Sequence, residues 1–128
     1  LRPWLSDSQR EQTILRITSR HPPPDDDSVG QWVALRGPRP VSGANALRQL
    51  IAATRYRASA EPPAVPMLVL ASRCDALVDA RSSHSLARRW QADIVEHPTA
   101  GHDLPLDDGP WLAQAVGAWL ASRGDYKI

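Results

Sequence analysis

Two side chains suited to acid–base chemistry follow two short apolar runs of the sequence. Asp75 comes directly after "MLVLASRC", and His102 comes directly after "DIVEHPTAG". A carboxylate that accepts an imidazole N–H fixes the tautomer of the histidine and stabilises its protonated form, which leaves the other ring nitrogen free as a general base for a nucleophile. This chemistry requires the two loops to meet, so the elements that carry them matter first.

The segments around the two residues predict a βαβ unit. Met67 to Ala71 is a continuous apolar run of strand formers, typical of a parallel strand buried on both faces, and "DIVEHP" indicates a second short strand. Between them, "SSHSLARRWQA" predicts an amphipathic helix with Leu86, Ala87 and Trp90 inward. Such a crossover places the strands parallel, and their carboxyl ends then lie at one sheet edge. We therefore expect Asp75 and His102 to meet there.

A final helix follows His102 in the stretch "GPWLAQAVGAWLASRG". Pro110 suits a first helical turn, and Gly124 suits a C-cap. The apolar residues of this helix recur at helical spacing and are expected to form its inner face: Trp111, Leu112, Ala115, Val116, Trp119 and Leu120.

The N-terminal half predicts two helices. Ser8 and Glu11 form a capping-box pattern, so we expect a helix over 8–20, ended by the loop "HPPPDDDSVG". The following "QWVALRGPRPVSG" is expected to be irregular because Gly37 and two prolines punctuate it.

A second helix, "ANALRQLIAATRYRA", follows a cap at Ser42 or Gly43. Its apolar side chains at three- and four-residue spacing indicate a helix over 43–55 that packs on another element: Leu47, Leu50, Ile51 and Thr54.

Composition excludes several classes of function. A chain of 128 residues is one domain's worth, and its 15 basic and 14 acidic residues are mixed along its length, which argues against nucleic acid or an anionic membrane as partner. No apolar run approaches a membrane span, and the first residues lack the pattern of a signal peptide. The lone Cys74 forms no internal disulfide, and the expected compartment is the cytoplasm.

Two parallel strands cannot form a stable sheet by themselves, because their outer edges leave backbone donors and acceptors unpaired. We therefore expect further strands from a missing N-terminal half of the protein or from a second chain.

The stretches "PMLVLASRCDALVD" and "AGHDLPLDDGPWLAQAVGAWL" together resemble the C-terminal end of an α/β-hydrolase-fold serine hydrolase. The resemblance implies an α/β fold in which residues 63–128 supply a parallel βαβ unit and the final helix of the hydrolase core. Residues 1–62 would then correspond to a cap- or lid-like helical segment inserted before the acid-bearing strand.

The resemblance also implies a function. Asp75 would orient His102, which would act as general base and acid in hydrolysing a carboxylic ester or related acyl bond of a small molecule, with no cofactor. The family's nucleophile motif, G-x-S-x-G, does not occur in this chain; the nearest stretch, "RPVSGAN", has Pro40 in place of the first glycine. We therefore expect the chain to be inactive alone. The alternative is a non-catalytic half-fold module that completes its sheet by oligomerisation.

Neighbouring residues have simpler interpretations than catalysis. Asp79, the rival acid, is expected to cap the helix after the first strand. Cys74 has no nearby cation to activate it and is expected to be structural. Four side chains near His102 suggest a metal site only superficially, since the histidine belongs to a strand and the carboxylates to a solvated loop and a helix start: His97, Asp103, Asp107 and Asp108.

Overall fold

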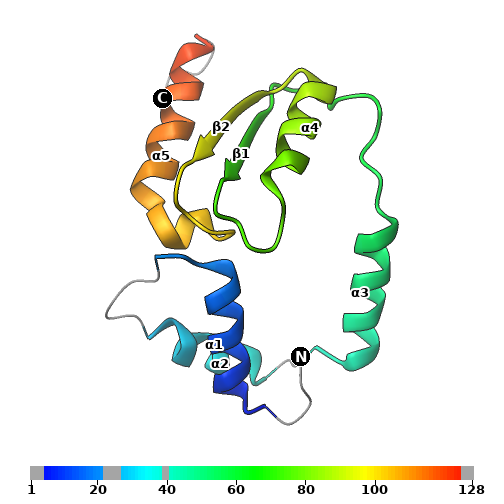
Figure 1. The fold of residues 1–128 in the computed structure, drawn as a ribbon, viewed down its shortest axis with the longest axis vertical. Helices are drawn as coiled ribbons and strands as arrows, with labels where there is room; N and C mark the ends of the chain where they lie inside the picture. The colour runs from blue at the N-terminus through cyan, green and yellow to red at the C-terminus, as the bar shows by residue number, and fades with distance from the viewer. Residues whose placement is uncertain (1–4, 22–26, 39–40, 125–128) are drawn as a thin grey trace.

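The computed structural model describes residues 5–21, 27–38 and 41–124. Figure 1 shows the elements in chain order: α1 (Asp7–Thr18), α2 (Ser28–Arg36), α3 (Gly43–Arg55), β1 (Leu68–Ser72), α4 (Ala80–Trp90), β2 (Asp93–His97) and α5 (Leu104–Ser122). The fold is α/β. Both strands lie in the second half of the chain.

The sheet formed by β1 and β2 is parallel, as the sequence predicts, and β1 begins one residue later than expected. Leu68 lies opposite Asp93, and Ser72 lies opposite His97. The Arg73 N–H donates to the His97 carbonyl at 2.9 Å, which extends the pairing past the strand end. The two following loops therefore leave the sheet side by side.

Helices α4 and α5 lie on opposite sides of this sheet (Figure 1). The Asp79 carboxylate caps α4 by accepting the Arg81 N–H at 2.9 Å, as predicted, and Ala87 is buried at 3% exposure. On the same side, Glu96 of β2 binds His84 Nε2 of α4 at 2.8 Å and Arg73 Nε at 3.0 Å. These contacts fix the crossover helix against the strand that leads to His102.

Helix α5 begins earlier than predicted and is kinked. Asp108 has non-helical backbone angles (φ −155°, ψ 73°), and its carboxylate accepts the Trp111 N–H at 3.0 Å. The kink separates a first segment from a second one that has Pro110 in its first turn, and Gly124 follows the helix with φ 67°. The expected inner face remains partly exposed, and Trp119 donates from Nε1 to Asp93 at 2.7 Å.

The first helix begins at a different cap from the predicted one. Ser6 accepts the Gln9 N–H at 3.2 Å, and the Gln9 side chain accepts the Ser6 N–H at 2.9 Å, so this pair forms the capping box. Glu11 is instead buried at 5% exposure and pairs with Arg36 of α2. The predicted Ser8 cap is therefore wrong. The helix also ends at Thr18, two residues before the predicted end at residue 20.

Helix α2 forms where an irregular segment was predicted. The Gly37 N–H closes this helix by donating to the Val33 carbonyl at 3.0 Å, so the glycine ends the helix rather than preventing it. The loop predicted over 21–30 lies partly outside the described residues, at 22–26, and its last three residues belong to α2 instead.

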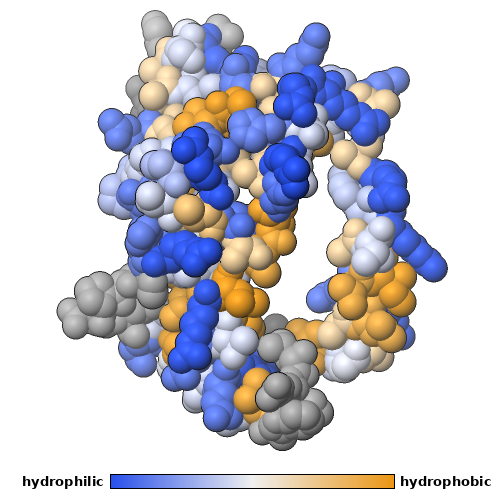
Figure 2. All heavy atoms as spheres, in the orientation of Figure 1, coloured by the Kyte–Doolittle hydropathy of each residue, from blue (hydrophilic) through white to orange (hydrophobic). Residues whose placement is uncertain are grey.

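Helix α3 forms as predicted and is capped by Ser42, which accepts the Asn45 N–H at 3.3 Å. Its apolar side chains do not pack as expected: Leu47 is 58% exposed, Leu50 62% and Ile51 40%. Figure 2 shows this helix standing apart, with apolar atoms on its surface and open space between it and the sheet region. None of the described residues covers this face of α3.

The core of the described chain is small. Its buried apolar residues are Ala71, Ala87, Ala100 and Leu104. In the described ranges, no helix combines the length and apolar character needed to cross a bilayer.

Candidate active site

Asp75 lies three residues after the end of β1, and backbone N–H groups of the same loop hold its carboxylate. Asp75 Oδ1 accepts the N–H of Leu77 at 2.7 Å and the N–H of Val78 at 2.9 Å. This arrangement is an Asx turn, in which an aspartate side chain substitutes for a backbone acceptor. The turn leaves Oδ2 free to point away from the loop.

The histidine loop brings His102 to that free oxygen. His102 Nδ1 lies 2.8 Å from Asp75 Oδ2, so the structure joins the two residues that the strand order predicts to meet. An ionised carboxylate can only accept, so in the neutral form of His102 the hydrogen is on Nδ1 and the lone pair on Nε2. The Asp75 side chain is 11% exposed and that of His102 is 45% exposed, which places the free Nε2 on the accessible partner.

The surroundings of Asp75 keep it ionised. Burial raises its pKa, but the hydrogen bonds from His102, Val78 and Leu77 outweigh burial and hold the pKa below the ordinary value of 3.8. At neutral pH, Asp75 is therefore a fixed negative charge beside the imidazole. Such a charge stabilises the imidazolium that forms when Nε2 accepts a proton.

A small pocket of about 140 Å³ opens at this pair. Its lining includes Asp75, His102 and Ser72 at the carboxyl end of β1. The Ser72 hydroxyl is buried and has no hydrogen-bond partner among the described residues. Of these side chains, the imidazole is the one that an entering group reaches, because the Ser72 hydroxyl is buried.

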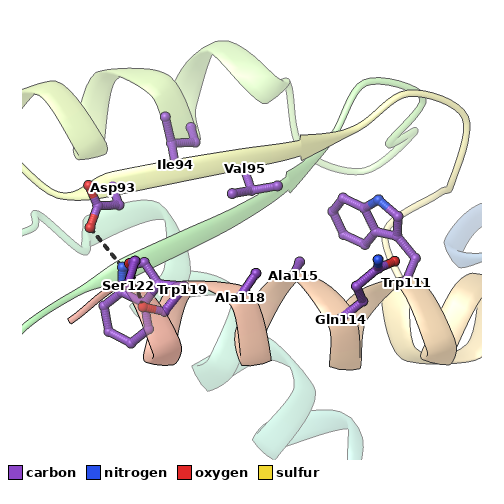
Figure 3. A pocket seen from close by; sticks show the side chains of 9 residues that line it. All are labelled: Asp93, Ile94, Val95, Trp111, Gln114, Ala115, Ala118, Trp119 and Ser122. Atoms are coloured by element: carbon purple, nitrogen blue, oxygen red, sulfur yellow. Dashed lines mark hydrogen bonds between the residues drawn. The ribbon is translucent and has the colours of Figure 1, made fainter. Parts of the chain in front are cut away.

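A larger groove of about 570 Å³ lies elsewhere, between β2 and α5 (Figure 3). Trp111 and Trp119 stand at its two ends, with Ala115 and Ala118 between them on α5. Neither Asp75 nor His102 lines this groove. The groove is larger than the pocket at Asp75 and His102, but it contains neither member of the predicted acid–base pair.

The other histidine near this edge is engaged by the backbone. His97 is 6% exposed, and its Nδ1 accepts the N–H groups of Thr99 at 3.2 Å and Ala100 at 2.8 Å. Its Nε2 lies 3.4 Å from Asp108 Oδ2, and its ring packs edge-on against that of Trp111 with the ring centroids 4.6 Å apart. This histidine shapes the loop that leads to His102.

No cluster of metal-ligating side chains occurs within the described ranges. Asp103 precedes α5 without making a side-chain cap hydrogen bond, and Asp108 accepts the Trp111 N–H. The Cys74 Sγ faces the Pro98 carbonyl at 3.6 Å and is half-buried. The residues around the pair therefore have structural contacts of their own.

The sequence interpretation missed Asp107. It predicts a solvated carboxylate, whereas the structure shows hydrogen bonds from Ser19, from the N–H groups of Arg20 and His21, and from the N–H of Gly101. Burial raises the pKa of Asp107, and these four donors outweigh burial and lower it. No local pattern signals this role, because three of the donors lie far away in sequence.

Comparisons with known proteins bear on the family and on the fold. The family model described as "Serine hydrolase" matches residues 31–111, a range that contains both Asp75 and His102. No curated protein matches the chain.

Among solved structures, the chain is similar to a crystal structure of a candidate lipase from Acinetobacter baumannii AYE. The TM-score is 0.61 and the identity 18%, over 88% of this chain. The chain spans 40% of the length of that structure. At this identity, the likeness shows a shared lipase-like hydrolase fold.

Proposed function

The chain belongs to the serine hydrolase family, and on that footing we propose that Asp75 and His102 are the acid and the base of its Ser-Asp-His triad. The observation that carries the proposal is the 2.8 Å contact between His102 Nδ1 and a carboxylate that its own loop holds in place. The proposed reaction is hydrolysis of a carboxylic ester or related acyl bond of a small molecule.

In the first half of this reaction, Nε2 of His102 takes the proton of a serine hydroxyl while the serine oxygen bonds to the acyl carbon. The protonated imidazole, stabilised by Asp75, then gives this proton to the alcohol oxygen as the acyl–oxygen bond breaks. The products are a free alcohol and an acyl-enzyme.

In the second half, a water molecule replaces the alcohol. Nε2 of His102 takes a proton from the water as the water oxygen bonds to the acyl carbon. His102 then gives this proton to the serine oxygen as the bond between serine and the acyl carbon breaks. The net result is an acid, an alcohol and a regenerated serine.

The serine is proposed to come from polypeptide outside these 128 residues, because the chain contains no G-x-S-x-G stretch. The two-stranded sheet of the described residues supports this assignment, since each strand has an edge without a neighbouring strand. We propose that the serine-bearing polypeptide completes the sheet and that residues 1–62 belong to a cap. Alone, the chain should not turn over substrate, because losing the nucleophile typically lowers kcat by about 10⁶.

The test begins with the intact mass of every polypeptide that co-purifies with the chain. The purified protein is then treated with a fluorophosphonate, which reacts covalently with activated serines. We expect one labelled serine within a G-x-S-x-G stretch, on a longer polypeptide or on a second chain. His102→Ala should abolish the labelling, whereas His84→Ala, a matched histidine on α4, should not.

A single species of 14.1 kDa that self-associates and takes no label would overturn the proposal. It would favour the non-catalytic module that completes its sheet with further copies of itself.

A further inference from the structure

The Asp107 carboxylate gathers donors from two distant parts of the chain. From the end of α1 it accepts the Ser19 hydroxyl, the Arg20 N–H at 2.9 Å and the His21 N–H at 3.2 Å. From the histidine loop it accepts the Gly101 N–H at 2.6 Å. Gly101 directly precedes His102, so this carboxylate holds the backbone from which the imidazole projects.

The histidine loop is pressed against the same end of α1. The Asp103 N–H donates to the Thr18 carbonyl at 2.8 Å. A Cβ added to Gly101 would lie 2.6 Å from the Thr18 oxygen and 3.1 Å from the Arg20 nitrogen, so only glycine permits this approach. His102 is thereby flanked on both sides by residues bonded to the 18–21 segment or to Asp107.

The 18–21 segment also reaches the acid loop. Arg20 Nε donates to the Cys74 carbonyl at 3.2 Å, and Cys74 directly precedes Asp75. The loop of the acid and the loop of the base are therefore tied to one segment, and that segment is held by Asp107.

We propose that Asp107 is a positioning residue for His102: by binding Gly101 and residues 19–21 together, it holds the imidazole against Asp75. This inference rests on the proposed function only for its catalytic consequence, since the geometry it invokes belongs to this chain alone. Asp107 makes no contact with His102 and acts through the backbone of Gly101.

The test uses the full chain labelled with ¹⁵N and follows the His102 imidazole by NMR. The native contact predicts a single tautomer protonated at Nδ1, with an Nδ1–H protected from exchange. Both oxygens of Asp107 accept hydrogen bonds, and in Asp107→Asn one of them becomes an NH₂ group that can only donate. The donors that face it lose their acceptor, so the histidine loop should become more mobile. We expect loss of the protected Nδ1–H signal and a mixture of the two tautomers.

Asp103→Asn is the matched control, because it removes the same charge from the residue next to His102, and the Asp103 carboxylate caps nothing. This variant should keep the native tautomer and the protected signal. The backbone amides of β1 and β2 report in every variant whether the sheet remains folded. Retention of the protected Nδ1–H in a folded Asp107→Asn would overturn the proposal.

If Asp107→Asn does not fold, Ser19→Ala tests the positioning role instead. This variant removes only one of the four hydrogen-bond donors to Asp107, so the chain should stay folded. We expect the His102 Nδ1–H of this variant to exchange several-fold faster than in the native chain, and an unchanged rate would overturn the proposal. In the serine-bearing enzyme, Asp107→Asn should lower kcat by about 10- to 100-fold at unchanged KM, the effect of a misplaced base.

The two proposals fail in different ways. If the native chain itself lacks the protected Nδ1–H, the Asp75–His102 pair is not formed and the proposed function fails with it. If the native chain has this signal and Asp107→Asn keeps it, only the positioning role fails.

Discussion

At the scale of single residues, the acid and the base of the site are held differently. Asp75 is bonded by its own Asx turn and has a side chain only 11% exposed, whereas the side chain of His102 is 45% exposed and has Asp75 as its contact. The Asp75 carboxylate is thus fixed in place, and the imidazole of His102 is the more accessible partner of the pair. Its orientation depends on the one bond to Asp75 and on the loop behind it.

The role of Asp75 can be tested with an isosteric change. In Asp75→Asn, the side-chain amide can donate a hydrogen bond to Nδ1 of His102. This favours the tautomer in which Nε2 carries the hydrogen, so Nε2 can no longer act as the base. We expect kcat of the serine-bearing enzyme to fall by about 10⁴, as in the serine proteases. Ester hydrolysis measures the effect, with Asp79→Asn as control because Asp79 caps α4 and binds Arg81. Equal losses in both variants would argue against the assignment.

Asp107 predicts a pH dependence of stability. Its pKa in the folded chain is lower than its ordinary value of 3.8, so its contribution is fully present above about pH 4 and is lost as the pH falls through the folded value. The unfolding free energy of Asp107→Asn should therefore lie below that of the native chain at pH 7, and the gap should narrow by pH 3. Urea titrations at the two pH values measure the gap. A gap of constant size would contradict the prediction.

Sequence reasoning at this scale found the pair but not its support. Asp75 and His102 follow from the rule that loops after parallel strands share one edge, which needs only local patterns. Asp107 bonds to Arg20, 87 positions away, and no periodicity or motif encodes such a contact. The same limit hid the ion pair of Glu11 with Arg36.

At the scale of elements, overlapping signals explain the errors. The N-terminal sequence contains two capping patterns, Ser6 with Gln9 and Ser8 with Glu11. The structure uses the first, because burial of Glu11 against α2 removes it from a capping role. The strands and α4 were predictable because their residue patterns are unambiguous, whereas α2 was missed because its terminating residues were interpreted as breakers.

The competing caps can be separated by two substitutions. Ser6→Ala removes the acceptor for the Gln9 N–H, which is one of the two hydrogen bonds of the capping box, so we expect a loss of about 1 kcal/mol in unfolding free energy. Ser8→Ala, inside the first turn, should change it by less than about 0.5 kcal/mol. Chemical denaturation followed by circular dichroism measures both. The reverse ranking would restore Ser8 as the cap.

At the scale of the whole molecule, the chain exposes more surface than a compact protein of its size. Its accessible area is 9521 Å², whereas a compact monomer of 14.1 kDa exposes about 6,700 Å². Helix α3 contributes to this exposure, since it stands off with its leucines exposed (Figure 2). The sequence correctly marks α3 as an amphipathic helix, but a pattern of this kind does not say which polypeptide covers it.

A charged residue introduced on the apolar face of α3 tests whether another polypeptide covers this helix in the complete protein. In the 128-residue chain, Leu50→Asp should change the unfolding free energy by less than about 0.5 kcal/mol, because Leu50 is 62% exposed. With the serine-bearing polypeptide present, the same change should cost about 2–5 kcal/mol, because a buried leucine is lost and a charge is buried. Gln49→Asp is the neighbouring control. A small effect in both settings would show that α3 remains uncovered.

The spacing of these contacts along the chain also sets the order in which they close during folding. Asp75 and His102 are 27 positions apart within one βαβ crossover, whereas Ser19 and Asp107 are 88 positions apart. Closing the longer loop costs about 1 kcal/mol more in conformational entropy, so we expect the contact between Asp75 and His102 to form before the hydrogen bonds of Asp107 with residues 19–21. The bond from Gly101 to Asp107 is local, since the two residues are six positions apart. We therefore expect a newly made chain to bring Asp75 and His102 together before residues 19–21 bind Asp107 and fix the position of the histidine loop.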